Sequence, residues 1–146
     1  LMKVGEDPHK YDVRPRDAQT IGRADLVLMN GMNLEATLGR VIEGNAGAAV
    51  VKLAEAPGVE PLRETDSIEG ALDPHAWMSV RNYKAYVEAA RAALAELLPE
   101  HADAISARAA AYAEELDALD AEVRAMLESV PQERRVIVTS HDAFNY

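Results

Sequence analysis

Short apolar runs alternate with amphipathic segments in the first third of the chain. Residues 25–29 and 48–53 are mainly apolar, as buried strands are, and turn-forming residues follow the first run. Residues 12–22 and 34–43 have the spacing of short helices, and glycine lies at or just after the end of each. Strands joined by helical crossovers run parallel. The pattern therefore predicts an α/β fold with a parallel sheet.

Two longer helices are predicted in the second half. Residues 79–98 carry apolar side chains three or four positions apart, and Pro99 ends this segment. Residues 103–129 would form a helix of roughly 40 Å with one apolar stripe. Because a small domain does not need this length, we interpret it as a rigid span between two lobes; an ordinary bundle helix is the alternative. Residues 135–139 are predicted to be the first strand of a new unit.

Residues 55–72 separate the two halves and show no hydrophobic period. They contain two prolines, two glycines and several acidic residues, which predicts a long surface loop. Loops of this length within compact domains are often functional.

Three of the four histidines have distinctive sequence surroundings. Residues 6–11 are Glu-Asp-Pro-His-Lys-Tyr and residues 73–78 are Asp-Pro-His-Ala-Trp-Met, so His9 and His75 each follow Asp-Pro and precede an aromatic residue by two positions. The fixed φ of proline makes each ring project from a rigid turn. His141 follows the apolar run at 135–139. Imidazole is the commonest side-chain ligand of zinc and related metals, so convergence of these rings predicts a metal site.

The neighbours of these histidines have more than one interpretation. Asp7 and Asp73 either cap their turns or orient an imidazole through its N–H. Three roles are open to Asp142: a hydrogen bond near His141, a general base, or the cap of a following helix, which is the favoured role. His101 is predicted to be an exposed residue outside the site. Three aromatic residues either enclose the site or belong to the core: Tyr11, Trp77 and Phe144.

Composition limits the classes of function. The 146 residues are 49% hydrophobic, which is enough for the core of one domain. The net charge of -10 argues against nucleic acid as a partner, because phosphate contacts need clustered Lys and Arg. No apolar run is long enough to span a bilayer. With no cysteine, any metal must have N and O ligands. The first and last residues suggest a fragment of a longer protein.

Together these motifs resemble the metal-binding subunits of cluster A-I ABC importers, the extracytoplasmic zinc and manganese binding proteins. The matching segments occur in the family's order and cover essentially the whole chain: residues 5–11, 24–31, 33–35, 73–78 and 140–146. The resemblance implies an α/β fold of two lobes with parallel sheets joined by one long rigid helix, present here as an incomplete fragment. Residues 1–102 would be part of the N-terminal metal-binding lobe, 103–130 the linking helix and 131–146 the start of the C-terminal lobe.

The resemblance also implies a site and a cargo. His9, His75 and His141 match three of the family's metal ligands, and the family's fourth ligand is usually an Asp carboxylate later in the chain. Family members selective for manganese often have Glu at the third position, whereas His141 is similar to the zinc-type pattern. Three imidazoles and one carboxylate also suit tetrahedral zinc. Zn²⁺ is therefore the expected transported ligand, with Mn²⁺ as the alternative.

The expected function is extracytoplasmic capture of this metal and its delivery to an ABC importer permease, without catalysis. The protein would be periplasmic or otherwise extracytoplasmic, and would meet the membrane only through the permease or a lipid anchor outside this segment. One alternative is a zinc-dependent hydrolase that uses the same three histidines, although H-E-x-x-H spacing is missing. A metal-binding adhesin, or a purely structural metal, is the other alternative.

Overall fold

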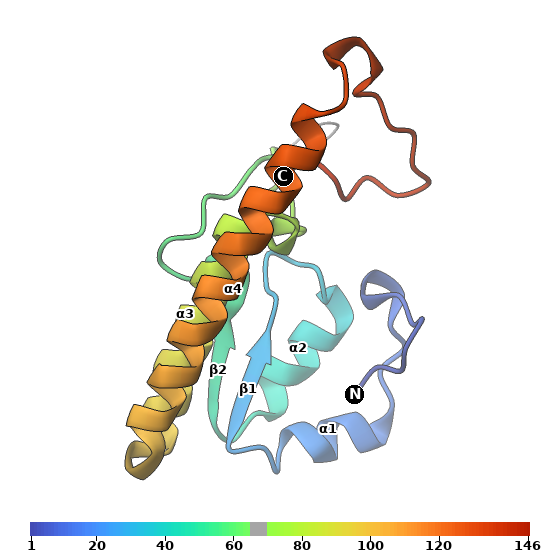
Figure 1. The fold of residues 1–146 in the computed structure, drawn as a ribbon. Coiled ribbons are helices and arrows are strands. Elements are labelled where there is room, and N and C mark those ends of the chain that lie inside the picture. Colours follow the sequence, from blue (N-terminus) through green and yellow to red (C-terminus); the bar gives the residue numbers. More distant parts are fainter. Residues whose placement is uncertain (65–69) are drawn as a thin grey trace.

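The structure is a computed structural model that describes residues 1–64 and 70–146, so part of the predicted loop at 55–72 lies outside the described residues (Figure 1). The main elements are α1 (Pro15–Ile21), β1 (Leu26–Met29), α2 (Ala36–Asn45), β2 (Ala49–Lys52), α3 (Val80–Leu97) and α4 (Ala102–Glu128). Short 3-10 helices lie at Pro8–Lys10, Leu53–Glu55, Ala76–Met78, Pro99–His101 and Gln132–Arg134.

The sheet consists of two parallel strands with a helical crossover. Leu26 of β1 pairs with Ala49 of β2, and the register continues to Met29 and Lys52. Helix α2 connects the strands, which confirms the α/β fold and the parallel pairing predicted from the alternation of apolar runs and helices. The carboxyl ends of both strands therefore lie at the same edge of the sheet.

Helices cover both sides of this sheet (Figure 1). On one side, α1 and α2 enclose the buried cluster of Tyr11, Ile21, Met29, Leu38 and Ile42. On the other side, α3 packs on the strands, and Tyr86 forms a second buried cluster with Ala54 and Ala76. The second cluster therefore places the start of α3 beside the carboxyl ends of the strands. Residues 73–78, called the His75 turn, lie just before α3 and at the same edge of the sheet.

The ends of α3 follow the local sequence closely. Ser79 is its N-cap and accepts a hydrogen bond from the backbone N–H of Asn82, as expected for a hydroxyl residue before a helix. At the other end, α3 stops at Leu97, two residues before Pro99, as predicted.

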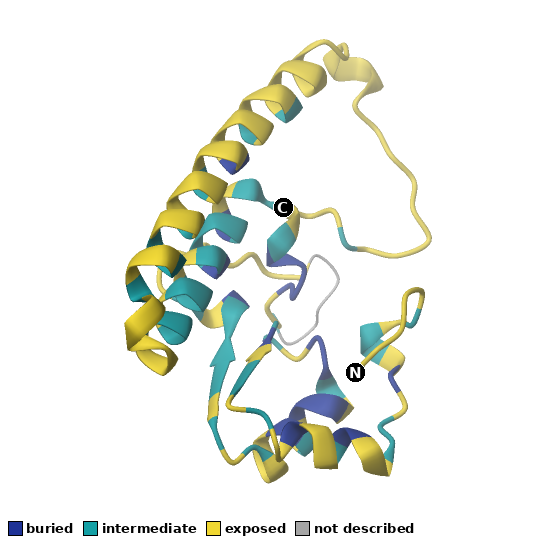
Figure 2. Cartoon of the chain, turned by 60° about the horizontal axis from the view of Figure 1, so that its bottom comes forward, coloured by how far each residue is buried: buried dark blue, intermediate teal, exposed yellow. Residues whose placement is uncertain are grey.

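Helix α4 is long and only partly covered. It packs against α3, and Leu116 is its one buried residue within the part of the chain that the structure describes. Nearer its C-terminus the helix continues beyond α3, where Met126 and Leu127 are 55% and 57% exposed (Figure 2). The predicted role of this helix as a span between two lobes stays a prediction. Within the described residues, no helix combines the length and apolar character that crossing a bilayer requires.

The prediction of a strand at residues 135–139 is wrong. Residues 135–146, called here the return segment, contain no strand, and Val136, Ile137 and Val138 are 77%, 71% and 96% exposed. A strand needs the hydrogen bonds of a neighbouring strand, and within residues 1–64 and 70–146 the sheet has only β1 and β2. The return segment instead leads back to the start of α3, where Tyr146 joins the cluster around Tyr86 (Figure 2).

Candidate metal centre

The His75 turn fixes both the backbone and the ring of His75. Asp73 Oδ1 accepts a hydrogen bond from the backbone N–H of His75 at 2.9 Å and lies 2.7 Å from the ring nitrogen Nδ1. Both residues are buried. Because a carboxylate accepts hydrogen bonds, Nδ1 is the donating nitrogen, and in the neutral ring the lone pair is then on Nε2. Asp73 therefore caps the turn and also orients the imidazole.

The His9 turn has the same sequence pattern but a different set of contacts. Asp7 Oδ1 accepts a hydrogen bond from the backbone N–H of His9 at 2.9 Å, while Oδ2 lies 4.0 Å from Lys10 Nζ. These contacts fit the turn-capping interpretation of Asp7. The two aspartates that look equivalent in the sequence therefore contact their histidines differently.

The three predicted histidines come together in space. His75 Nε2 lies 3.2 Å from His9 Nε2 and 2.9 Å from His141 Nε2, and one ring nitrogen from each residue lies within 4.8 Å of the others. Two nitrogen ligands of a tetrahedral zinc ion, each about 2.0–2.1 Å from it, are separated by roughly 3.3 Å. The spacing of the imidazoles thus approaches that of neighbouring metal ligands.

The histidines border an open cavity of about 360 Å³. His75 is buried, His9 is half-buried and His141, on the return segment, is exposed. Leu34 and Trp77 form part of the wall. The arrangement has a rigid inner side, made by the two Asp-Pro-His turns, and an accessible outer side.

The electrostatic surroundings favour a neutral His9. Burial lowers the pKa of His9, and the neighbouring His75 lowers it further, while Asp7 opposes the shift. A neutral imidazole is the form that binds a metal, so the lowered pKa favours the binding-competent form of His9.

The aromatic residues named in the sequence divide between the site and the rest of the molecule. The Trp77 ring meets the His75 ring edge-on at a centroid distance of 5.2 Å, so Trp77 belongs to the site. Tyr11 lies in the core and its hydroxyl donates to Asp17 at 2.9 Å. Phe144 is 53% exposed. Of these three residues, Trp77 is the one that encloses the histidines.

Two further expectations concern charged residues. His101 is exposed, with Nε2 3.8 Å from a carboxylate oxygen of Glu100, and lies outside the site as predicted. The expected capping role of Asp142 is wrong, because residues 143–146, which follow it, are not helical.

Sequence reasoning missed the side chain that connects β1 to the His75 turn. Asn30 Nδ2 donates to the backbone oxygen of Pro74 at 2.9 Å. In the sequence, Asn30 and Gly31 indicated only the end of a strand. The available signal was a polar residue at the carboxyl end of a parallel strand, where α/β folds place their sites.

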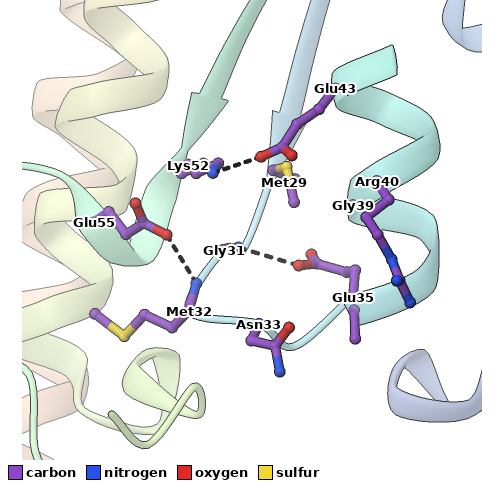
Figure 3. Close-up of a pocket in the computed structure, with 11 residues that line it drawn as sticks. Met29, Gly31, Met32, Asn33, Glu35, Gly39, Arg40, Glu43, Lys52 and Glu55 are labelled. Atoms are coloured by element: carbon purple, nitrogen blue, oxygen red, sulfur yellow. Dashed lines mark hydrogen bonds and ion pairs between the residues drawn. The ribbon is translucent and has the colours of Figure 1, made fainter. Parts of the chain in front are cut away.

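A second cavity, of about 140 Å³, is lined in part by charged residues (Figure 3). Its carboxylates already have partners. Glu35 accepts from the backbone N–H groups of Asn30 and Gly31, Glu55 accepts from that of Met32, and Glu43 pairs with Lys52. Glu35 and Glu55 therefore stabilise the turn between β1 and α2, while Glu43 connects α2 to β2.

The fold is that of the solute-binding proteins of metal uptake systems. A solved structure of the periplasmic zinc-binding protein TroA from Treponema pallidum matches it with a TM-score of 0.90 and 38% identity, over 99% of this chain and 52% of the TroA chain. The chain belongs to the family described as zinc-uptake complex component A, periplasmic, whose model matches residues 1–146.

The names of individual relatives refer to different metals. The manganese-binding lipoprotein MntA of Halalkalibacterium halodurans is 36% identical over 146 residues, covering 100% of this chain and 47% of MntA. The iron-binding protein YfeA of Yersinia pestis is 42% identical over 148 residues, with 100% and 47% coverage. The chain thus spans about half the length of the curated relatives it matches.

Loss of the Asp73 carboxylate should weaken metal binding more than loss of Asp7. We expect Asp73→Ala to raise the zinc dissociation constant about 10–100-fold, because the His75 ring loses the partner that orients it. Asp7→Ala, which removes a turn cap of similar chemistry, should change it less than about threefold, since a lost cap costs mainly folding stability. Chelator-competition titrations of both variants measure the difference, and equal losses would contradict the separate roles.

Proposed function

We propose that this chain binds a divalent transition metal through His9, His75 and His141, as the capture component of an uptake system. The observation that carries the proposal is the convergence of the three Nε2 atoms, 3.2 and 2.9 Å from His75 to its neighbours. The contact of Asp73 with His75 Nδ1 supports it, because that contact leaves the lone pair of His75 on the atom that faces the other two rings.

Zinc is the metal we favour. The names of the relatives refer to zinc, manganese and iron, so family membership alone does not identify the metal. Our choice of metal therefore rests on the ligand atoms. Three imidazole nitrogens suit zinc, whereas manganese prefers more oxygen donors. We expect a carboxylate to complete a tetrahedral shell, with no position left for a reactive water.

Delivery to the permease of an ABC importer is the second part of the proposal. The family's description as a periplasmic uptake component agrees with the extracytoplasmic location predicted from the sequence. In this arrangement residues 1–102 belong to the N-terminal lobe, 103–130 form the linking helix and 131–146 lead into the C-terminal lobe. The exposed apolar end of α4 is consistent with a covering lobe.

The family consists of uptake components rather than enzymes, which agrees with the predicted absence of catalysis and disfavours the hydrolase alternative. A purely structural metal would make folding depend on the ion. The buried clusters on both sides of the sheet give this chain a core that is independent of the histidines.

Zinc titration of the complete protein tests the proposed function. We expect one tightly bound Zn²⁺ per chain, weaker binding of Mn²⁺, and a folded apo protein after chelation, monitored by calorimetry and circular dichroism. Absence of zinc binding, or unfolding on removal of the metal, would contradict the proposal.

Metal affinity should fall as the pH falls. Protons compete with the metal for each imidazole, so we expect the zinc dissociation constant to rise by at least about 100-fold between pH 7 and pH 5.

The stability of the apo protein should also depend on pH. The pKa of His9 lies below its ordinary value of 6.5, so protonation of His9 favours unfolding, and the apo protein should lose stability as the pH falls below 6.5. Titrations and thermal unfolding across this range measure both effects, and a flat affinity profile would exclude histidine ligands.

A further inference from the structure

We propose that Asn30 is a positioning residue for His75, setting the backbone of the turn from which the ring projects. The inference rests on the proposed function, since it concerns how one of the three histidines reaches the metal. Asn30 directly follows β1, while the Pro74–His75 peptide bond lies 44 residues later in the sequence. One amide side chain connects the two.

The contact is made to the peptide unit that precedes His75. Asn30 Nδ2 donates to the backbone oxygen of Pro74 at 2.9 Å and to that of Gly31 at 3.1 Å. The Pro74 oxygen lies in the same plane as the backbone N–H of His75, because the peptide bond is planar. The hydrogen bond to Asn30 therefore limits rotation of that plane and, with it, the direction of the His75 side chain.

The amide of Asn30 is itself held in one orientation. The hydroxyl of Tyr86, on α3, donates to Asn30 Oδ1 at 2.8 Å, which leaves Nδ2 facing Pro74. Burial raises the pKa of Tyr86, so the hydroxyl stays protonated and remains a donor. Helix α3 thus determines which end of the amide meets the turn.

The backbone of Asn30 is equally well connected. Its N–H donates to Glu35 Oε1 at 2.7 Å, and its oxygen accepts from the backbone N–H of Ala54 at 2.8 Å. Asn30 therefore bonds to the residue before α2, to the segment after β2, and to α3. These contacts fix the position of Asn30. Its side chain can therefore restrain the His75 turn, which is not part of the sheet.

Asn30 and Asp73 hold His75 through different contacts, and Asp73 is the one of the two that contacts the ring. Asp73 contacts the ring nitrogen and limits rotation of the imidazole about its side-chain bonds. Asn30 contacts the backbone before the ring and limits movement of the whole turn. Both motions displace Nε2 relative to His9 and His141, so loss of Asn30 should alter metal geometry even with all three ligands present.

Asn30→Asp tests this inference, with Asn82→Asp as the matched control. The first change places an oxygen against the Pro74 oxygen in place of a donating nitrogen. The second removes a buried amide, 2% exposed, that bonds the backbone N–H and oxygen of Glu60 in the loop. Tyr86→Phe is a milder second variant that removes the donor to Asn30 Oδ1. Each is made in the complete protein.

The readouts are the visible absorption of bound Co²⁺, the zinc dissociation constant and the melting temperature of the apo protein. We expect Asn30→Asp to shift the Co²⁺ bands and weaken zinc binding at least about tenfold, and Tyr86→Phe to act in the same direction with a smaller effect. Asn82→Asp should lower the melting temperature while leaving the Co²⁺ spectrum unchanged and the zinc affinity within about twofold.

Two results would overturn the inference while leaving the proposed function intact. The first is wild-type Co²⁺ bands and affinity in both Asn30→Asp and Tyr86→Phe. The second is an equal loss of affinity in Asn82→Asp, which would show that any buried amide has this effect. Failure of the unmodified protein to bind Co²⁺ or Zn²⁺ would instead overturn the proposed function and this inference with it.

Discussion

His75→Ala should abolish tight zinc binding. His75 Nε2 is the atom that lies nearest to both other imidazoles, at 3.2 Å from His9 and 2.9 Å from His141. Its loss removes one of three nitrogen donors and leaves the buried Asp73 carboxylate without its ring partner. Because loss of an outer partner alone costs about 10–100-fold in affinity, we expect the loss of a ligand to exceed about 100-fold, as measured by chelator competition.

His101→Ala is the matched control. His101 is exposed, and its Nε2 lies 3.8 Å from a carboxylate oxygen of Glu100 at the surface. Its removal should leave the zinc dissociation constant within about twofold, because the residue lies outside the cavity and surface pairs contribute little. Equal effects of the two substitutions would contradict the assignment of the site.

Glu35→Ala should lower the free energy of unfolding of the apo protein by about 2–4 kcal/mol, because the buried carboxylate accepts from two backbone N–H groups and each such group costs about 1–3 kcal/mol when left unpaired. The acceptor distances are 2.7 Å to Asn30 N and 3.1 Å to Gly31 N. The turn beside it has positive φ at Gly31, Met32 and Asn33, of 85°, 48° and 62°, and this strained backbone depends on such contacts.

Glu43→Ala provides the comparison for this prediction. Glu43 borders the same cavity as Glu35 and pairs with Lys52 at 2.8 Å (Figure 3). Both side chains of this pair are substantially exposed. Its loss should cost less than about 1 kcal/mol. Urea unfolding of the two variants gives the difference, and similar costs would mean that the hydrogen bonds of Glu35 do not stabilise the turn.

The parts of the fold that sequence predicted are those fixed by local chemistry. Ser79 and Pro99 delimit α3 because a hydroxyl caps a helix start and a proline prevents its continuation. The apolar runs around Val27 and Val50 gave two strands, and their parallel pairing followed from the helix between them. The incorrect prediction of a strand at residues 135–139 shows the limit of such reasoning. An apolar run forms a strand only where a neighbouring strand is available to pair with it.

In the candidate site, too, the sequence predicted the features that local chemistry fixes and missed those that depend on packing. The Asp-Pro-His sequence was sufficient to single out His9 and His75, because proline makes the turn a local property. The different contacts of Asp7 and Asp73 were not visible, since both have the same neighbours in the sequence. Asn30 was also missed, because its contact with Pro74 joins residues 44 positions apart. Such a contact depends on how the strands and α3 pack.

The spacing of the histidines has a consequence for the unfolded chain. His9 and His75 are 66 residues apart, and so are His75 and His141. Closing a flexible loop of that length costs roughly 4 kcal/mol in chain entropy, and an unfolded chain would have to close two of them to surround one ion. In the folded chain packing has already closed both loops, so an ion held by all three rings acts as a cross-link between three distant parts of the sequence.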